Sequence, residues 1–89
     1  MQAVRIVITG VVQGVFFRKY AFEQAINLGI DGFVTNVADG NVMIEATGDD
    51  QSIEELIQWC HRGSPNSVIE KVDVTEIPKR EYQGFTIRY

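Results

Sequence analysis

The chain contains a single cysteine and a single histidine, Cys60 and His61, among 89 residues. One cysteine cannot form an intramolecular disulfide, and these counts exclude the cysteine and histidine frameworks that hold structural zinc. A catalytic triad would have to use His61, which follows Cys60 directly on a predicted helix, where neighbouring side chains point about 100° apart. We therefore expect no metal site and no catalysis based on cysteine or histidine.

The sequence also lacks a long apolar run and a surplus of positive charge. No stretch of about 18 apolar residues exists to span a membrane, and the N-terminus does not resemble a signal peptide. Eight Lys and Arg against twelve Asp and Glu give a formal charge of −4, which disfavours nucleic acids and anionic membranes as partners. We expect a cytoplasmic protein that binds neither of these, and a monomer, because no excess of apolar surface is evident.

The apolar residues present are sufficient for one hydrophobic core. They make up 45% of the 89 positions, with no repeat, low-complexity tract or linker, so we predict a single domain over residues 1–89. A domain of this size buries only about 60% of its unfolded surface. The functional site is therefore expected on a surface loop.

The spacing of apolar residues predicts the order strand, helix, strand, strand, helix, strand, followed by a short final strand. β-Branched or alternating runs indicate the strands, and stripes of apolar residues at helical spacing indicate the helices. In chain order these are a strand over 4–9 ended by Gly10, a helix over 17–28 capped by Gly29, strands over 30–37 and 41–47, a helix starting at Ser52 and ending before Gly63, a strand from Val68 to before Pro78, and a strand over 85–89.

Two local signals and the element order predict the fold. Asp39-Gly40 is typical of a tight hairpin turn, so the strands around it should pair antiparallel. Ser52 followed three residues later by Glu55 indicates a capping box at the start of the second helix. The order predicts an α+β ferredoxin-like sandwich, with an antiparallel sheet and both helices on one face. This fold hosts enzymes, ligand sensors and RNA binders, so it does not decide the function.

The loop between the first strand and the first helix is the predicted functional site. Gly10 and Gly14 bracket it, and Arg18 and Lys19 follow in the first helical turn, where cations face the positive end of the helix dipole. A bound anion would relieve this repulsion, held by converging backbone N–H groups and by Arg18. The loop is not a Walker A loop, because no Lys-Ser/Thr pair follows the glycines. The spacing alone also fits a simple turn followed by two solvated basic residues.

Residues 10–18, GVVQGVFFR, resemble the acylphosphatase signature Gly-x-Val-Gln-Gly-Val-x-Phe-Arg at every fixed position. The similarity continues through Leu28-Gly29 and Asp39-Gly40 to Arg88-Tyr89, so it spans nearly the whole chain. A related domain begins larger carbamoyl-transfer proteins, but we expect this chain to be a free-standing enzyme. The resemblance implies a ferredoxin-like fold and hydrolysis of the carboxyl-phosphate bond of small acyl phosphates, without a metal or cofactor.

The resemblance also implies which residues act. Arg18 matches the signature arginine, and Asn36 matches an asparagine that orients the attacking water. Asn36 could otherwise simply shape the approach to the following hairpin. In the predicted fold the first and second strands run parallel with the third between them, which brings Arg18 and Asn36 to the same edge of the sheet. The residues expected to hold the phosphate, within loop 10–18, are Gly14, Val15, Phe16, Phe17 and Arg18.

A noncatalytic phosphate-binding regulatory module on the same fold is the alternative. Such a module needs the loop and Arg18 but no amide to orient water, so Asn36 favours the enzyme. An RNA-recognition module is disfavoured, because the predicted central strands carry neither exposed aromatic residues nor a basic surface.

Other conspicuous side chains are expected to be structural. Cys60 lies on the apolar face of the second predicted helix and should be a buried small residue, and Trp59, at the border of that face, should pack. Of Phe16 and Phe17, one should anchor the loop in the core and the other should lie near the acyl group of the substrate.

The chain departs from the family pattern at two places. Thr35 precedes Asn36 where the family usually has a basic residue, which removes a charge near the site. Gly63-Ser64-Pro65-Asn66 stands where a Gly-Pro-Pro-like turn is common. We expect this second change to affect only its own loop.

Overall fold

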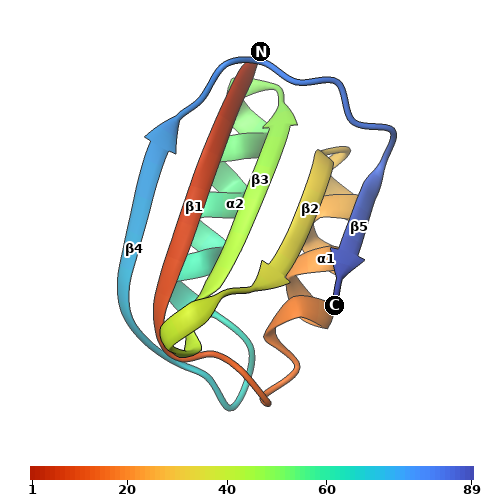
Figure 1. The fold of residues 1–89 in the computed structure, drawn as a ribbon. Coiled ribbons are helices and arrows are strands. Elements are labelled where there is room, and N and C mark those ends of the chain that lie inside the picture. The colour runs from red at the N-terminus through yellow and green to blue at the C-terminus, as the bar shows by residue number, and fades with distance from the viewer.

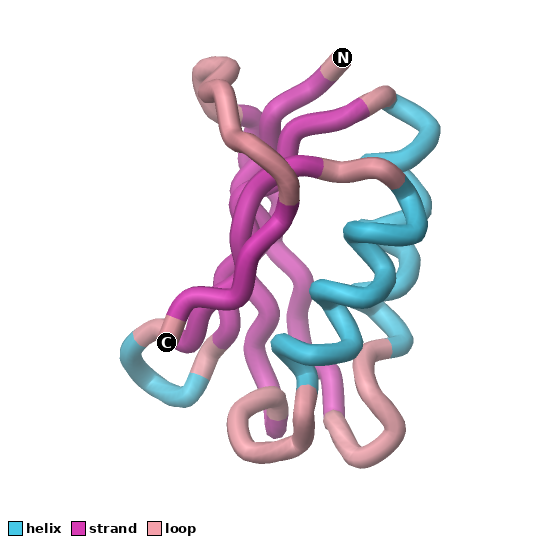
Figure 2. The backbone as a smooth tube through the Cα atoms, turned by 90° about the vertical axis from the view of Figure 1, so that its right-hand side faces the viewer, coloured by secondary structure: helices cyan, strands magenta, loops and turns pink.

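A five-stranded sheet covered on one face by two helices makes up the computed structural model, which describes residues 1–89 (Figures 1 and 2). The predicted order of helices and strands is confirmed. The elements are β1 (Gln2–Val11), α1 (Phe17–Leu28), β2 (Asp31–Asn36), a short 3-10 turn (Ala38–Gly40), β3 (Val42–Gly48), α2 (Asp50–Arg62), β4 (Val68–Glu76) and β5 (Phe85–Arg88).

The strands lie in the order β4-β1-β3-β2-β5. Both β1 and β2 pair antiparallel with β3, so they run parallel to each other on either side of it, as predicted. The last strand, β5, pairs parallel with β2, so the sheet is mixed and not antiparallel throughout. This follows because the chain leaves β4 at one edge, crosses the end of the sheet and reverses direction into β5 at the other edge (Figure 1). The architecture is the predicted α+β ferredoxin-like sandwich.

The hydrophobic core lies between the helices and the sheet. The inward side chains of β1, Val4, Ile6 and Ile8, are all fully buried there. The rings of Phe17 in α1 and Trp59 in α2 pack with their centroids 5.1 Å apart, which joins the two helices above the sheet. The predicted packing role of Trp59 is therefore confirmed. Neither helix has the length and apolar character that crossing a membrane requires.

Cys60 is buried in this core with no exposed surface. Burial raises the pKa of its thiol to about 12, so the reactive thiolate is not formed near neutral pH. This confirms the structural role predicted for Cys60. No three His, Cys, Asp or Glu side chains lie close enough together to hold a metal ion.

The second helix begins earlier than predicted. Its first residue is Asp50, so Ser52 lies within the first turn and the predicted capping box with Glu55 is wrong. Asp49 is the N-cap residue, and its backbone carbonyl accepts a hydrogen bond from the Ile53 N–H at 2.9 Å. The carboxylate of Asp50 in the first turn interacts favourably with the helix dipole, which supports this earlier start.

Gly10 does not end the first strand. The pairing of β1 with β4 shifts register between Thr9 and Gly10 and then continues through Val11. Gly10 has φ of 140°, and a Cβ atom there would collide with the carbonyl of Val68, so the glycine allows two strands to approach closely at a bulge. The loop between β1 and α1 is therefore residues 12–16, shorter than the predicted loop 10–18.

A polar cluster on the sheet face away from the helices consists of Arg5, Glu45, Arg80 and Tyr82. The Glu45 side chain is only 5% exposed, and it accepts hydrogen bonds from Tyr82 Oη at 2.6 Å and from Arg5 Nη2 at 3.0 Å. Burial alone would raise the pKa of Glu45, but these hydrogen bonds and the charges of Arg5 and Arg80 outweigh it and lower that pKa. This Glu45 cluster fastens residues 77–84 to the sheet.

Candidate active site

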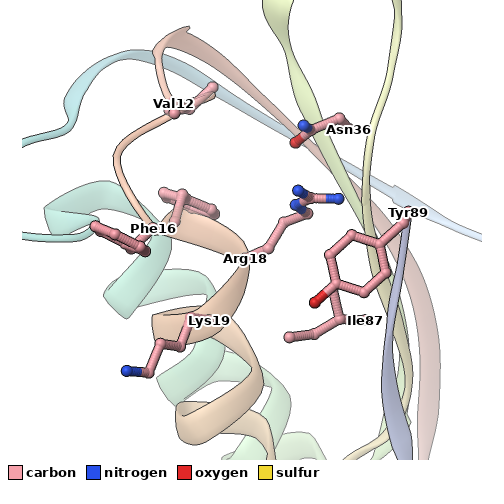
Figure 3. A pocket seen from close by; sticks show the side chains of 9 residues that line it. Val12, Phe16, Arg18, Lys19, Asn36, Ile87 and Tyr89 are labelled. Carbon is pink, nitrogen blue, oxygen red and sulfur yellow. The ribbon is translucent and has the colours of Figure 1, made fainter.

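A pocket of about 460 Å³ opens where the β1–α1 loop, the start of α1, the end of β2 and the C-terminal segment meet (Figure 3). Five of the six predicted site residues line it. The exception is Val15, whose side chain packs against the core. The lining residues are Val12, Gly14, Phe16, Phe17, Arg18, Lys19, Asn36, Ile87 and Tyr89.

Arg18 is held at the pocket by the C-terminal segment. Its Nη1 donates a hydrogen bond to the Arg88 carbonyl at 3.0 Å, and its guanidinium carbon lies 4.7 Å from the centre of the Tyr89 ring. No carboxylate pairs with Arg18, and the first turn of α1 contains no acidic residue. Its guanidinium group faces the side chain of Asn36 (Figure 3). The pocket therefore holds a positive charge with no counterion from the protein.

The backbone of the β1–α1 loop presents free hydrogen-bond donors to the same pocket. Phe16 is in the left-handed conformation, with φ of 59° and ψ of 23°, and Phe17 begins the right-handed helix α1. Alternation of left- and right-handed residues directs successive N–H groups to one side, which forms an anion-binding nest. The amides of residues 14–19 donate no hydrogen bond to the rest of the protein. Backbone and Arg18 together form a site suited to a phosphate group.

The two phenylalanines of this loop divide as predicted with respect to the core. Phe17 is 1% exposed and belongs to the hydrophobic core, whereas Phe16 is 72% exposed and lines the pocket. The buried ring of Phe17 fixes the start of α1. The adjacent Phe16 is in the left-handed conformation, which typically costs a residue with a side chain about 1–2 kcal/mol. The surrounding structure must therefore hold Phe16 in this conformation.

Asn36 is the last residue of β2, and its side chain enters the pocket opposite Arg18 (Figure 3). The predicted meeting of these two residues is observed. The Oδ1 atom of Asn36 is buried and has no hydrogen-bond partner. Buried polar atoms without a partner are rare in folded proteins, so this acceptor is available for water or a ligand.

Gln13 was missed as a site residue by the sequence analysis. Its Nε2 donates hydrogen bonds to the carbonyls of Val37 at 3.0 Å and Asn41 at 2.8 Å. These bonds tie the β1–α1 loop to the turn that follows Asn36, so both parts of the pocket are held together. The available signal was that Gln13 occupies the fixed glutamine position of the residue 10–18 signature, but no local spacing identifies carbonyl partners that lie so far along the chain.

The turn after α2 contacts the pocket loop, contrary to the expectation that its departure from the family pattern would affect only its own loop. The Ser64 hydroxyl donates a hydrogen bond to the Val15 carbonyl at 3.0 Å. The other departure, Thr35, does not line the pocket. Its hydroxyl donates to the carbonyl of Asn36 at 3.3 Å, so this position contributes no charge to the site.

Comparison with known proteins agrees with this geometry. The sequence matches the family model described as Acylphosphatase over residues 4–87. It is 49% identical to an acylphosphatase of Rhizorhabdus wittichii over 82 residues, which cover 92% of this chain and 83% of that protein. It is 46% identical to an acylphosphatase of Shewanella amazonensis over 88 residues, which cover 98% and 97% of the two chains.

The fold is similar to that of a solved structure over the whole length of both chains. The match to the crystal structure of acylphosphatase from Bacillus subtilis has a TM-score of 0.95 and 34% sequence identity, and covers 100% of both chains. A family match over residues 4–87 and relatives that align with nearly the whole chain agree with one another. This chain belongs to the acylphosphatase family.

Proposed function

We propose that the enzyme hydrolyses an acyl phosphate in the pocket of Figure 3, without a metal ion, by holding the phosphate in the β1–α1 loop and directing water with Asn36. The observation that carries this proposal is that unpaired amides, an arginine without a carboxylate partner and an unpartnered Asn36 Oδ1 line one pocket. Each of these groups lacks a partner that a bound phosphate and a water molecule would supply.

The β1–α1 loop and Arg18 are proposed to bind the phosphate group. The N–H groups of Gly14, Val15, Phe16, Phe17 and Arg18 are assigned to its oxygens, together with the free N–H groups of the Arg18 guanidinium. During phosphoryl transfer, negative charge is spread over the equatorial oxygens, and fixed donors around them stabilise the transition state. Arg18 therefore acts in both binding and catalysis.

Asn36 is proposed to orient the attacking water. Its Oδ1 accepts a hydrogen bond from the water, whose oxygen then forms a bond to phosphorus as the bond to the acyl oxygen breaks. The electron pair of that bond leaves with the carboxylate, and a proton of the water passes to a phosphate oxygen. The carboxylate is a weak base and needs no general acid, so Asn36 remains uncharged throughout.

The acyl part of the substrate is proposed to lie against the apolar side of the pocket. Phe16, Ile87 and Tyr89 line this side, and the side chains of Phe16 and Tyr89 are largely exposed. We further propose a cytoplasmic monomer. A free buried thiol suits a reducing compartment.

The noncatalytic alternative is not favoured, because the matched relatives are acylphosphatases. It would also leave the unpartnered Oδ1 of Asn36 without a role.

The test is hydrolysis of benzoyl phosphate in excess chelator, with a nitrophenyl phosphate ester as the control substrate. We expect rapid, chelator-resistant loss of the acyl phosphate alone, and strong loss of activity in Arg18→Ala and in Asn36→Ala. In water enriched in ¹⁸O, the label should enter inorganic phosphate, because water attacks phosphorus. Label in benzoate would contradict the mechanism, and folded protein that binds phosphate without turnover would support the noncatalytic alternative.

A further inference from the structure

We propose that Ser64 is a positioning residue for the phosphate-binding loop, acting through the peptide bond between Val15 and Phe16. By holding the Val15 carbonyl, the Ser64 hydroxyl keeps the Phe16 N–H directed into the pocket. This inference rests on the proposed function, because it assigns that N–H to the substrate phosphate. Ser64 is in the turn after α2 and does not line the pocket.

The hydrogen bond is well formed and partly buried. Ser64 Oγ lies 3.0 Å from the Val15 carbonyl oxygen, and Ser64 is 3% exposed, so water has little access to the Ser64 side of this bond. The chain contains no cis peptide bond, and in a trans peptide the C=O and N–H groups point in opposite directions. A Val15 carbonyl held toward the turn after α2 therefore directs the Phe16 N–H the other way.

The conformation of Phe16 explains why this peptide needs to be held. Phe16 has φ of 59°, which is unfavourable for a residue with a side chain. Rotating the Val15–Phe16 peptide by about 180° would bring φ of Phe16 to a negative value, as residues with a side chain ordinarily adopt. The same rotation would turn the Val15 carbonyl toward the pocket, where its oxygen would repel a phosphate. The Ser64 hydrogen bond opposes this rotation.

The turn around Ser64 is itself held in place. Gly63 has φ of 74°, and the carbonyl of Ser64 accepts hydrogen bonds from Ser67 Oγ at 2.7 Å and from the Ser67 N–H at 3.0 Å. Ser67 thus provides a matched control. Its hydroxyl also bonds to a backbone carbonyl in the same turn, but it makes no hydrogen bond to the phosphate-binding loop.

The experiment compares Ser64→Ala with Ser67→Ala. For each variant we would measure the inhibition constant of inorganic phosphate, the kcat and KM for benzoyl phosphate, and the melting temperature. Loss of one hydrogen bond corresponds to a change of about three- to tenfold, so Ser64→Ala should raise the phosphate inhibition constant and KM by about that factor. Ser67→Ala should lower the melting temperature about as much as Ser64→Ala does. Its inhibition constant should stay unchanged, because the Ser67 N–H still donates to the Ser64 carbonyl at 3.0 Å and holds the turn.

A well-folded Ser64→Ala variant with wild-type phosphate inhibition would overturn the proposal, as would equal weakening in both variants. Amide NMR spectra of the wild-type protein give a second test that does not depend on the variants folding. On titration with inorganic phosphate, the Phe16 N–H signal should shift together with that of Arg18. A shift at Arg18 without one at Phe16 refutes the role of Ser64, whereas no shift at residues 14–19 refutes the phosphate-binding loop itself.

Discussion

The pocket at Arg18 and the Glu45 cluster both place arginine beside tyrosine and other polar groups, but they differ in the hydrogen-bonding capacity that remains free. In the cluster, both carboxylate oxygens of Glu45 are used, one by Arg5 and the other by Tyr82 and Arg80. In the pocket, Arg18 makes a single hydrogen bond to a carbonyl. The two sites use similar residues for different purposes.

This difference separates a structural site from a binding site. Satisfied polar groups contribute to the stability of the fold, and removing one partner leaves the others exposed or unpaired. Unsatisfied groups instead retain their capacity for a ligand, at a cost to stability. Variants of the pocket should therefore change activity far more than stability, and variants of the Glu45 cluster should do the reverse.

The largest effect is expected for Arg18→Ala. We expect kcat/KM for benzoyl phosphate to fall by about 10²–10³-fold, because the transition state loses a charged donor. The melting temperature should change little, since Arg18 makes one hydrogen bond at the surface. Arg80→Ala is the matched control from the Glu45 cluster and should keep nearly all activity. Comparable activity losses in the two variants would remove the distinction between the sites.

Asn36→Ala should separate the effect on activity from the effect on stability more clearly than Arg18→Ala does. We expect kcat to fall by about 10²-fold with a smaller change in KM, because the water and not the phosphate loses its partner. The free energy of unfolding, measured by urea denaturation, should stay level or rise slightly, because a buried acceptor without a partner is removed. A marked loss of stability would show that Asn36 has a structural partner.

Glu45→Ala is the converse variant. It should lower the free energy of unfolding by about 1–3 kcal/mol, because the Tyr82 hydroxyl loses its acceptor and two arginines lose their shared carboxylate. The kcat/KM should remain near the wild-type value, since the cluster lies outside the pocket. Glu70→Ala, on exposed β4, is the control and should change neither quantity. Activity loss without destabilisation in Glu45→Ala would contradict the comparison.

The smallest effect concerns pH. The folded structure lowers the pKa of Glu45 from its ordinary value of 4.5, so its stabilising contribution is present above pH 4.5 and is lost as pH falls through the lower folded value. The difference in unfolding free energy between wild type and Glu45→Gln should therefore shrink as pH falls below 4.5. Urea denaturation of both proteins at pH 7 and at a series of pH values below 4.5 measures this difference. A difference independent of pH would show that the ionised carboxylate contributes nothing.

The starts and ends of several elements show how far local sequence could predict the fold. The stripe from Phe17 to Leu28 and the glycine after it correctly predicted α1, because helix periodicity and a left-handed C-cap are properties of a short segment. The predictions based on Ser52 and Gly10 were wrong, because these two element ends are not properties of a short segment. Whether Ser52 caps a helix, or Gly10 ends a strand, depends on the backbone hydrogen bonds that the neighbouring segments complete.

The sequence by itself determined the order of elements and the core positions. The residue 10–18 signature gave the candidate Arg18, and the wider resemblance to the acylphosphatase family gave Asn36. Only the tertiary structure decided which polar groups would be satisfied. Gln13, Ser64 and Glu45 all find their partners at least 24 positions away along the chain. Periodicity describes one segment at a time, whereas these hydrogen bonds form only after the sheet and helices bring distant segments together. The same packing leaves Asn36 Oδ1 without a partner.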